Sequence, residues 1–230
     1  MISYAQMLED VLLDRALRHV REGFYIDVGG YHPDRDSVTK HFYEQGWNGV
    51  NIEPGASYFP EFVRLRPRDI NLHVAVSDHA GEATFYEMDQ ISTLETRFAN
   101  RHSEHLTGQY TVPLMTLAQI CEQHAPNDIH FLKIDVEGHE AAVIRGADFA
   151  RFRPWVMVIE AKEPNNLDAS THGEWEQMVL DAGYTFAHAD ILNRYYVANE
   201  RRNLLQYFSL PADDYRRAND IWRIMELERH

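Results

Sequence analysis

The chain has 230 residues, of which 44% are apolar, and its 22 Lys and Arg against 36 Asp and Glu give a formal net charge of −14. The excess of acid and the absence of a long basic block exclude nucleic acid and anionic membrane surfaces as partners. A single cysteine, no signal-peptide pattern and no apolar run of membrane-spanning length make us expect a cytoplasmic protein.

The N-terminal part of the chain predicts one helix followed by a β-α-β unit. Apolar residues at three- and four-residue intervals predict an amphipathic helix from Tyr4 to Val20, with Ser3 as its N-cap, within a segment 1–22. A short apolar run, Phe24 to Val28, predicts a buried strand that enters the turn Gly29-Gly30. A helix from Ser37 to Gln45 and a strand from Val50 to Glu53 complete the unit, so the two strands should be parallel.

The same alternation continues through most of the chain and predicts a doubly wound, mostly parallel sheet, an α/β fold. Met88 to Gln109 is polar and without pattern, and we interpret it as a long loop, while residues 201–230 read as a helical tail. The remaining helices are predicted at Ser57 to Leu65, Thr116 (as N-cap) to Gln123, His139 to Arg145 and Trp175 to Leu180. The remaining strands are predicted at Asn71 to Val76, Gly81 to Tyr86, Thr111 to Leu114, Ile129 to Ile134, Trp155 to Ile159 and, as an antiparallel pair, Tyr184 to Ala187 and Arg194 to Ala198.

The predicted strands end in polar residues, and ligands of open α/β sheets bind beyond the carboxyl ends of the strands. Gly29-Gly30 lets the backbone approach a ligand, and Glu53 follows at a spacing close to the roughly 20 residues at which an acid binds a ribose. This indicates a nucleoside cofactor. Pro33 removes one of the amides that a pyrophosphate needs, which favours S-adenosylmethionine (SAM) over NAD. The alternative is that the glycines form only a tight turn and that Glu53 is a solvated acid.

A second group of candidate residues lies in the segment Lys133 to Glu140. His139 opens a predicted helix at the same edge and is our candidate general base, because its unperturbed pKa lies near neutrality. Asp135 and Glu160 end neighbouring strands and could hold Mg²⁺, which prefers oxygen ligands. The alternatives are that His139 only caps its helix and that the two carboxylates only polarise the pocket.

Several motifs resemble the FkbM family of SAM-dependent methyltransferases. They are FYIDVGG at Phe24 to Gly30, VNIEP at Val50 to Pro54, LHVAVSD at Leu72 to Asp78, LKIDVEGHE at Leu132 to Glu140 and DILNRYYV at Asp190 to Val197. The resemblance implies a class I methyltransferase domain over residues 23–200, with a Rossmann-like sheet of seven strands of which the last is antiparallel. It also implies methyl transfer from SAM to a hydroxyl.

The resemblance also assigns residues to the cofactor. Asp27, Gly29 and Gly30 would line the methionine end, Glu53 would bind the ribose and Ser77 would lie by the adenine. Asp135 would lie close to the sulfonium or a metal. After the first glycine the family usually has a small residue and then an asparagine. Here Gly30 and Tyr31 take these places, and we expect Tyr31 to contact the cofactor.

We expect the substrate to be a small-molecule or oligosaccharide hydroxyl, because the long polar loop offers hydrogen-bond partners and few apolar walls. Thr93, Asn193 and Tyr195 are the candidate substrate contacts. A homodimer could use the N-terminal helix or the tail. An NAD-dependent oxidoreductase and a non-catalytic binding protein of the same fold are the competing hypotheses.

Overall fold

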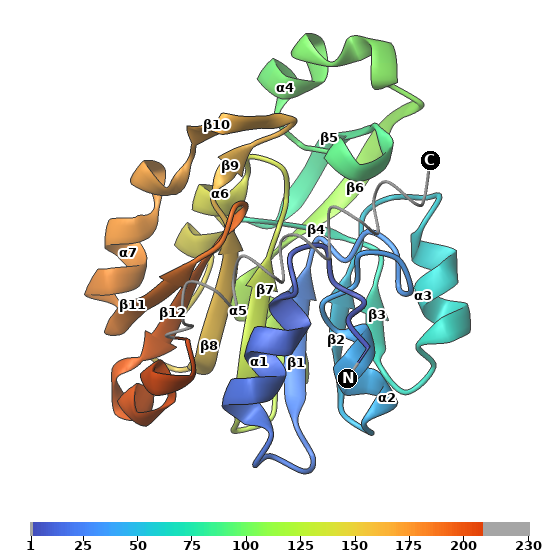
Figure 1. Ribbon diagram of the computed structural model, residues 1–230. Coiled ribbons are helices and arrows are strands. Elements are labelled where there is room, and N and C mark those ends of the chain that lie inside the picture. Colours follow the sequence, from blue (N-terminus) through green and yellow to red (C-terminus); the bar gives the residue numbers. More distant parts are fainter. Residues whose placement is uncertain (1, 209–230) are drawn as a thin grey trace.

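The computed structural model describes residues 2–208 and contains a seven-stranded sheet in the order β11-β12-β8-β7-β1-β2-β3 (Figure 1). The five strands from β8 to β3 run parallel, whereas β12 is antiparallel to β8 and to β11. This is the class I methyltransferase arrangement, so the predicted fold class and the antiparallel last strand are confirmed. The strands are β1 (Phe24–Val28), β2 (Asn48–Ile52), β3 (Ile70–Leu72), β7 (Ile129–Ile134), β8 (Pro154–Glu160), β11 (Tyr184–Ala189) and β12 (Asn193–Ala198).

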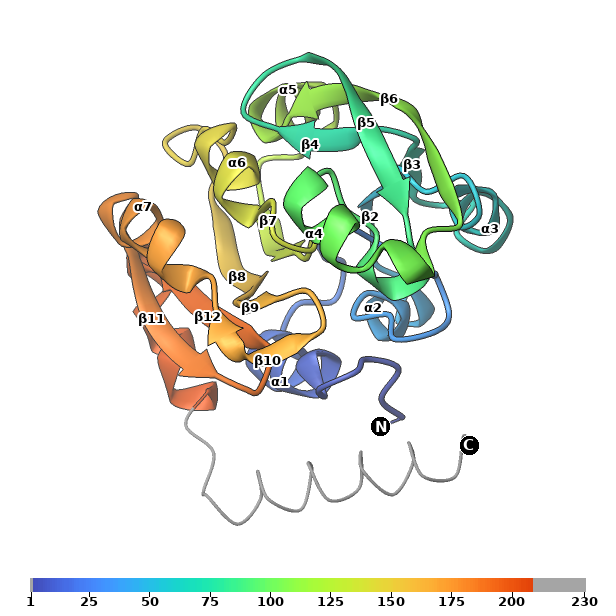
Figure 2. The same cartoon turned by 90° about the horizontal axis from the view of Figure 1, so that it is seen from above.

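Helices cover both faces of this sheet, as the view along the sheet shows (Figure 2). One face packs against α1 (Glu9–Leu17), α2 (Lys40–Glu44) and the 3₁₀ segment η4 (Asn199–Tyr207), with Leu13, Phe42 and Leu204 in its core. The other face packs against α5 (Leu117–His124), α6 (Glu140–Arg145) and α7 (Glu176–Asp181), which supply Ile120, Val143 and Val179. Burial on both faces explains why β1 and β7 read as nearly continuous apolar runs. The helix α3 (Phe59–Leu65) contacts β3.

A smaller sheet lies above the carboxyl ends of the main strands (Figure 1). Its order is β4-β6-β5, and a segment between β5 and β6, residues 88–107, extends over the same region. A short hairpin of β9 and β10 follows β8. The elements are β4 (Ala75–Ser77), β5 (Gly81–Glu87), η1 (Asp89–Ile91), α4 (Thr96–Arg101), η2 (Ser103–His105), β6 (Gly108–Thr116), β9 (Lys162–Glu163), β10 (Asn166–Ser170) and η3 (His172–Glu174).

Two predicted elements differ from the structure around this smaller sheet. The single strand expected from Asn71 to Val76 is two strands, because the chain leaves the main sheet after Leu72 and joins the smaller one at Ala75. The loop expected from Met88 to Gln109 contains α4, whose buried residues are Phe98 and Ala99. A helix of six residues is too short to show a clear periodic pattern, so the sequence did not reveal it.

The N-terminal helix is shorter than predicted and begins at Glu9. Ser3 is not its N-cap: its hydroxyl donates to Asp10 Oδ1 at 2.6 Å, so the preceding segment folds back onto the first turn. In contrast, Thr116 caps α5 as predicted, in a capping box with Gln119. The tail expected over 201–230 begins with η4, and residues 209–230 lie outside the described part. No helix among residues 2–208 has the length and apolar character that a bilayer crossing requires.

Candidate active site

A cavity of about 630 Å³ lies at the carboxyl ends of β1, β2 and β7. The chain passes from β1 to β2 and β3 on one side and returns to β7 and β8 on the other, so this is the point where strand order reverses. Such switch points are where open α/β sheets bind ligands. We call it the first cavity. Gly29, Tyr31, Glu53, Asp135 and His139 are among its lining residues.

The glycine turn after β1 is required by close backbone packing. Gly29 has φ +79°, and a Cβ there would lie 1.7 Å from the Asp135 carbonyl oxygen. A Cβ on Gly30 would lie 2.7 Å from the Phe62 ring. Both glycine amides donate to the Ile52 carbonyl oxygen, at 3.0 and 3.1 Å. Gly29 therefore lines the cavity, whereas Gly30 packs behind it.

Glu53 is held in place by the backbone on both sides of its carboxylate. Oε2 accepts the Tyr31 amide at 2.7 Å, and Oε1 accepts the Gly55 amide at 2.6 Å. Burial raises the pKa of Glu53 to about 8, although the two amides and the nearby Lys133 oppose this shift. The sequence placed Glu53 at the ligand edge, and the structure brings it into the first cavity.

Asp27 does not line the first cavity, because it is buried under the turn and paired with Lys133. The Lys133 ammonium lies 3.3 Å from Asp27 Oδ1 and 3.2 Å from Asp135 Oδ2, and it donates to the Gly29 carbonyl oxygen at 2.7 Å. Burial alone would lower the pKa of Lys133, but the two carboxylates outweigh it and raise the pKa. The sequence analysis did not assign Lys133. A lysine inside a fully buried strand must be paired with an acid, so its position in the apolar run Ile129 to Ile134 could have indicated an ion pair.

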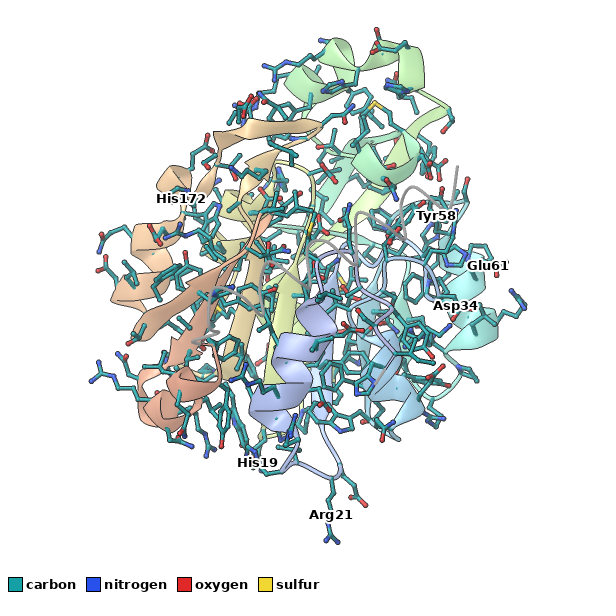
Figure 3. All side chains as sticks on the ribbon, viewed as in Figure 1. His19, Arg21, Asp34, Tyr58, Glu61 and His172 are labelled. Carbon is teal, nitrogen blue, oxygen red and sulfur yellow. The ribbon has the colours of Figure 1, made fainter. Side chains whose placement is uncertain are left out.

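Aromatic side chains form one rim of the first cavity. Tyr31 has φ +52°, and its ring centroid lies 4.6 Å from that of Tyr58. Both hydroxyls donate to Asp89 Oδ1 of η1, which joins residues 88–107 to the main sheet. Figure 3 shows Tyr58 beside α3 in the upper part of the molecule, whereas His19 and Arg21 lie at the lower end. A non-glycine residue with positive φ is costly, and such strain is concentrated at functional sites.

His139 occupies the N-cap position of α6, and both of its ring nitrogens have partners. Nδ1 lies 2.7 Å from Glu95 Oε1, and Nε2 lies 3.0 Å from Ser77 Oγ. The hydrogen bond to His139 lowers the pKa of Glu95. Ser77 is buried at the end of β4 and is not among the residues that line the first cavity. The three side chains therefore connect the smaller sheet, the segment 88–107 and α6 in one chain of hydrogen bonds.

Three carboxylates meet beside the first cavity. Asp135, Glu137 and Glu160 each place an oxygen so that all three lie within 4.8 Å of one another. Glu160 is 7% exposed, and its Oε2 has no hydrogen-bond partner among residues 2–208. Burial, followed by the mutual repulsion of these acids, raises the pKa of Glu137 and of Glu160 well above the ordinary value. A donor set made only of carboxylate oxygens fits a hard divalent cation.

A second cavity, with a volume of about 770 Å³, adjoins this cluster. It shares Tyr31, Gln90, Asp135 and Glu137 with the first cavity. Glu160 and the β9–β10 hairpin form its far side. The sequence analysis did not predict this hairpin or this cavity, because the two strands have only two and five residues.

Comparison with known proteins decides the family. A family model described as the methyltransferase FkbM domain matches residues 27–186, which is well over half of the chain. The chain belongs to the FkbM methyltransferase family. A solved structure described as a TehB-like SAM-dependent methyltransferase from Corynebacterium glutamicum is similar at 10% identity with a TM-score of 0.46, over 85% of this chain and 89% of that one. No curated protein matches the chain.

The three substrate contacts predicted for this FkbM methyltransferase lie in different environments. Thr93 lines the first cavity, and its hydroxyl donates to the Glu137 carbonyl oxygen at 2.8 Å. Asn193 and Tyr195 line neither cavity, because the alternation of side chains along β12 turns both toward the α1 face of the sheet. Asn193 donates to Glu9 at 2.9 Å, and Tyr195 donates to Asp190 at 2.6 Å. The structure thus gives these two side chains buried partners in the fold instead of a place in a substrate site.

Proposed function

We propose that this FkbM methyltransferase transfers a methyl group from SAM to a hydroxyl of a saccharide or a glycosylated natural product. The observation that carries the proposal is the first cavity at the switch point, where the Glu53 carboxylate is held by two backbone amides beside the Gly29 turn. A carboxylate at this position can accept both hydroxyls of a ribose. Asp135 adds a carboxylate to the wall toward the second cavity, which suits a cationic sulfonium.

The backbone of the glycine turn favours SAM over NAD. A pyrophosphate is bound by free amides at a helix N-terminus. Here the amides of Gly29 and Gly30 donate to Ile52, the amide of Tyr31 donates to Glu53, and Pro33 has none. A dinucleotide would find these donors already used and three carboxylates nearby, so a cofactor without phosphates fits better.

The residues around the two cavities supply alignment and proton removal. When bound, SAM supplies an activated methyl group, so the protein must chiefly orient the acceptor oxygen behind that methyl. His139 is the proposed general base. A proton on Nδ1 faces the Glu95 carboxylate and leaves Nε2 as an acceptor, which is the tautomer a base requires. Because Ser77 Oγ is hydrogen bonded to Nε2, the serine hydroxyl must turn away before His139 can accept a proton from the substrate.

The carboxylate cluster is the proposed Mg²⁺ site, with Asp135 and Glu160 as ligands and Glu137 as a third. Bound there, Mg²⁺ would lower the pKa of a coordinated hydroxyl. Lys133 already neutralises part of the charge on Asp135, so the ion would share this carboxylate with the ammonium. Glu160 Oε2, which has no other partner in the described part of the chain, is the oxygen best prepared to receive a cation.

Calorimetric titration with SAM and with NAD tests the cofactor, and labelled SAM mixed with sugar and aglycone acceptors tests the reaction. We expect SAM to bind, NAD not to bind, and label to appear on an acceptor oxygen. Tight NAD binding without SAM binding would favour an oxidoreductase. SAM binding with no transfer to any acceptor would favour a non-catalytic binding protein.

A further inference from the structure

The smaller sheet contacts the loop that carries Glu53. This loop, residues 53–58, joins β2 to α3, and within it the Gly55 amide holds Glu53 Oε1. The next amide along the chain, that of Ala56, donates to the hydroxyl oxygen of Tyr110 at 2.7 Å. Because Tyr110 belongs to β6, a strand of the smaller sheet fixes the backbone directly beside the amide that holds Glu53.

The third successive amide of the loop is held by a buried carboxylate. The Ser57 amide donates to Glu87 Oε1 at 3.0 Å. Glu87 ends β5 and is 6% exposed, and its own carbonyl oxygen accepts the Thr107 amide at 2.8 Å and the Thr107 hydroxyl at 3.0 Å. Neither Glu87 nor Tyr110 lines the first cavity. These two side chains can therefore affect a ligand in that cavity only through the loop.

The packing around Gly55 couples the position of the loop to that of the Glu53 carboxylate. A Cβ on Gly55 would lie 2.6 Å from Glu53 Oε1 and 3.3 Å from Glu87 Oε1. The two carboxylate oxygens thus lie close to the same backbone position. Because Oε1 of Glu53 is also hydrogen bonded to the Gly55 amide, a shift of the loop moves the carboxylate with it.

The same end of β5 supports the other oxygen of Glu53. Oε2 accepts the Tyr31 amide, and the Tyr31 hydroxyl donates to Asp89 Oδ1 at 3.0 Å. Asp89 follows β5 by two residues, so Glu87 and Asp89 support the two sides of one carboxylate from one strand end. Tyr31 has a positive φ, and such a conformation persists only where surrounding contacts maintain it.

We infer that Glu87, Asp89 and Tyr110 are positioning residues, through which the smaller sheet controls the affinity for the cofactor ribose. They fix the two backbone segments whose amides hold Glu53. A carboxylate that is fixed before binding loses less side-chain freedom when it accepts the ribose hydroxyls. The inference rests on the proposed function, because it assumes that Glu53 binds the ribose of SAM.

Tyr110→Phe removes one supporting hydroxyl, and calorimetric titration with S-adenosylhomocysteine measures the effect. We expect the dissociation constant to rise about threefold to tenfold, the usual effect of one lost hydrogen bond. The control Tyr184→Phe also loses a hydrogen bond between a tyrosine hydroxyl and the backbone, at the amino end of β8, and should leave the constant unchanged. An unchanged constant in Tyr110→Phe, or an equal rise in both variants, would overturn the inference.

Two substitutions of Glu87 give an independent comparison. Glu87→Ala should raise the dissociation constant as Tyr110→Phe does. Glu87→Gln, which keeps an oxygen for the Ser57 amide, should recover most of the affinity. Equal losses in the two variants would contradict the positioning role of Glu87.

A double-mutant cycle shows whether the effect passes through Glu53. In the Glu53→Ala background, Tyr110→Phe should add no further loss, because the group that it positions is absent. The same result is expected with an analogue of S-adenosylhomocysteine that lacks both ribose hydroxyls. A full additional loss in either case would overturn the inference. If the wild type binds neither SAM nor S-adenosylhomocysteine, the proposed function is overturned instead.

Discussion

The Lys133 ammonium lies 3.2 Å from Asp135 Oδ2, and on its other side it lies 3.3 Å from Asp27 Oδ1. One buried lysine thus joins a carboxylate under the glycine turn to a carboxylate on the cavity wall. Parallel pairing of β1 with β7 sets Asp27 directly opposite Lys133, so this contact follows from the register of the sheet. The pair links the fold of the turn to the charge of the candidate active site.

Lys133→Met should destabilise the protein, because it leaves the buried Asp27 carboxylate without its counter-charge. The expected loss is about 3–5 kcal/mol in the free energy of unfolding, measured by urea denaturation. The double variant Lys133→Met, Asp27→Leu should regain much of this loss, since no isolated charge remains. If the single variant unfolds at the same urea concentration as the wild type, the ion pair does not stabilise the turn.

Glu53→Ala should weaken SAM binding while leaving the fold intact. Loss of hydrogen bonds between ribose hydroxyls and a carboxylate should cost about 1.5–3 kcal/mol, or roughly 10-fold to 150-fold in the dissociation constant. Calorimetric titration measures this directly, and Glu61→Ala, on the outer side of α3, is the control. An affinity equal to that of the wild type would remove Glu53 from the cofactor site.

His139→Gln should slow methyl transfer roughly 100-fold or more if the imidazole is the general base. The SAM dissociation constant should change less than about twofold, because removal of a proton acceptor acts on the chemical step. Glu95→Gln should slow the reaction in the same direction through the lost partner of Nδ1. Single-turnover measurements with bound SAM separate the steps, and an unchanged rate in His139→Gln would assign the histidine to holding segment 88–107 in place.

Chelation should lower activity if the carboxylate cluster holds Mg²⁺. Activity measured in EDTA should fall and return when Mg²⁺ is added in excess. In Glu160→Gln the added ion should restore little, because this variant lacks the oxygen that has no partner in the described structure. Full activity in EDTA would mean that the three carboxylates act without a metal.

The free energy of unfolding should depend on pH through Glu9, a residue of α1 that accepts a hydrogen bond from Asn193 of β12. Burial, followed by the nearby Asp190 carboxylate, raises the pKa of Glu9 to about 8. The pKa of Glu9 is therefore higher in the folded protein than in the unfolded chain. Its contribution to the free energy of unfolding is full below about pH 4.5 and is lost as the pH rises to about 8. Buried histidines such as His130, whose pKa is lowered, act in the opposite direction. The contribution of Glu9 is therefore measured as the difference in the free energy of unfolding between the wild type and a variant without this carboxylate.

Glu9→Gln should become more stable relative to the wild type as the pH rises from 5 to 8, because it removes the group that must ionise while buried. Urea unfolding at several pH values measures this difference, and the exposed Glu22→Gln is the control. A difference that stays constant with pH would show that Glu9 does not change its ionisation on unfolding.

The parallel core of the fold could be predicted because its signals are local. β1 and β7 are short apolar runs followed by turn residues, and α5 starts at a threonine with a glutamine three residues later. The break between β3 and β4 could not be predicted in this way. Residues 72–76 read as one strand, and only long-range pairing decides that the chain changes sheet there.

The candidate site could also be predicted only where its signals are local. Gly29, Glu53 and Asp135 could be placed at one edge because each ends or directly follows a predicted strand. Lys133 and the second cavity depend on which strands and loops become neighbours, and no local pattern contains that information. Asn193 and Tyr195 were expected near the substrate but line neither cavity, because proximity to the last strands does not tell which face a side chain occupies.

A crystal structure of the protein grown with S-adenosylhomocysteine tests the central claim most directly. The compound should occupy the first cavity, with its ribose hydroxyls within hydrogen-bond distance of Glu53 and its sulfur on the Asp135 side, facing the second cavity. A compound found elsewhere, or a first cavity left without it at saturating concentration, would contradict the account.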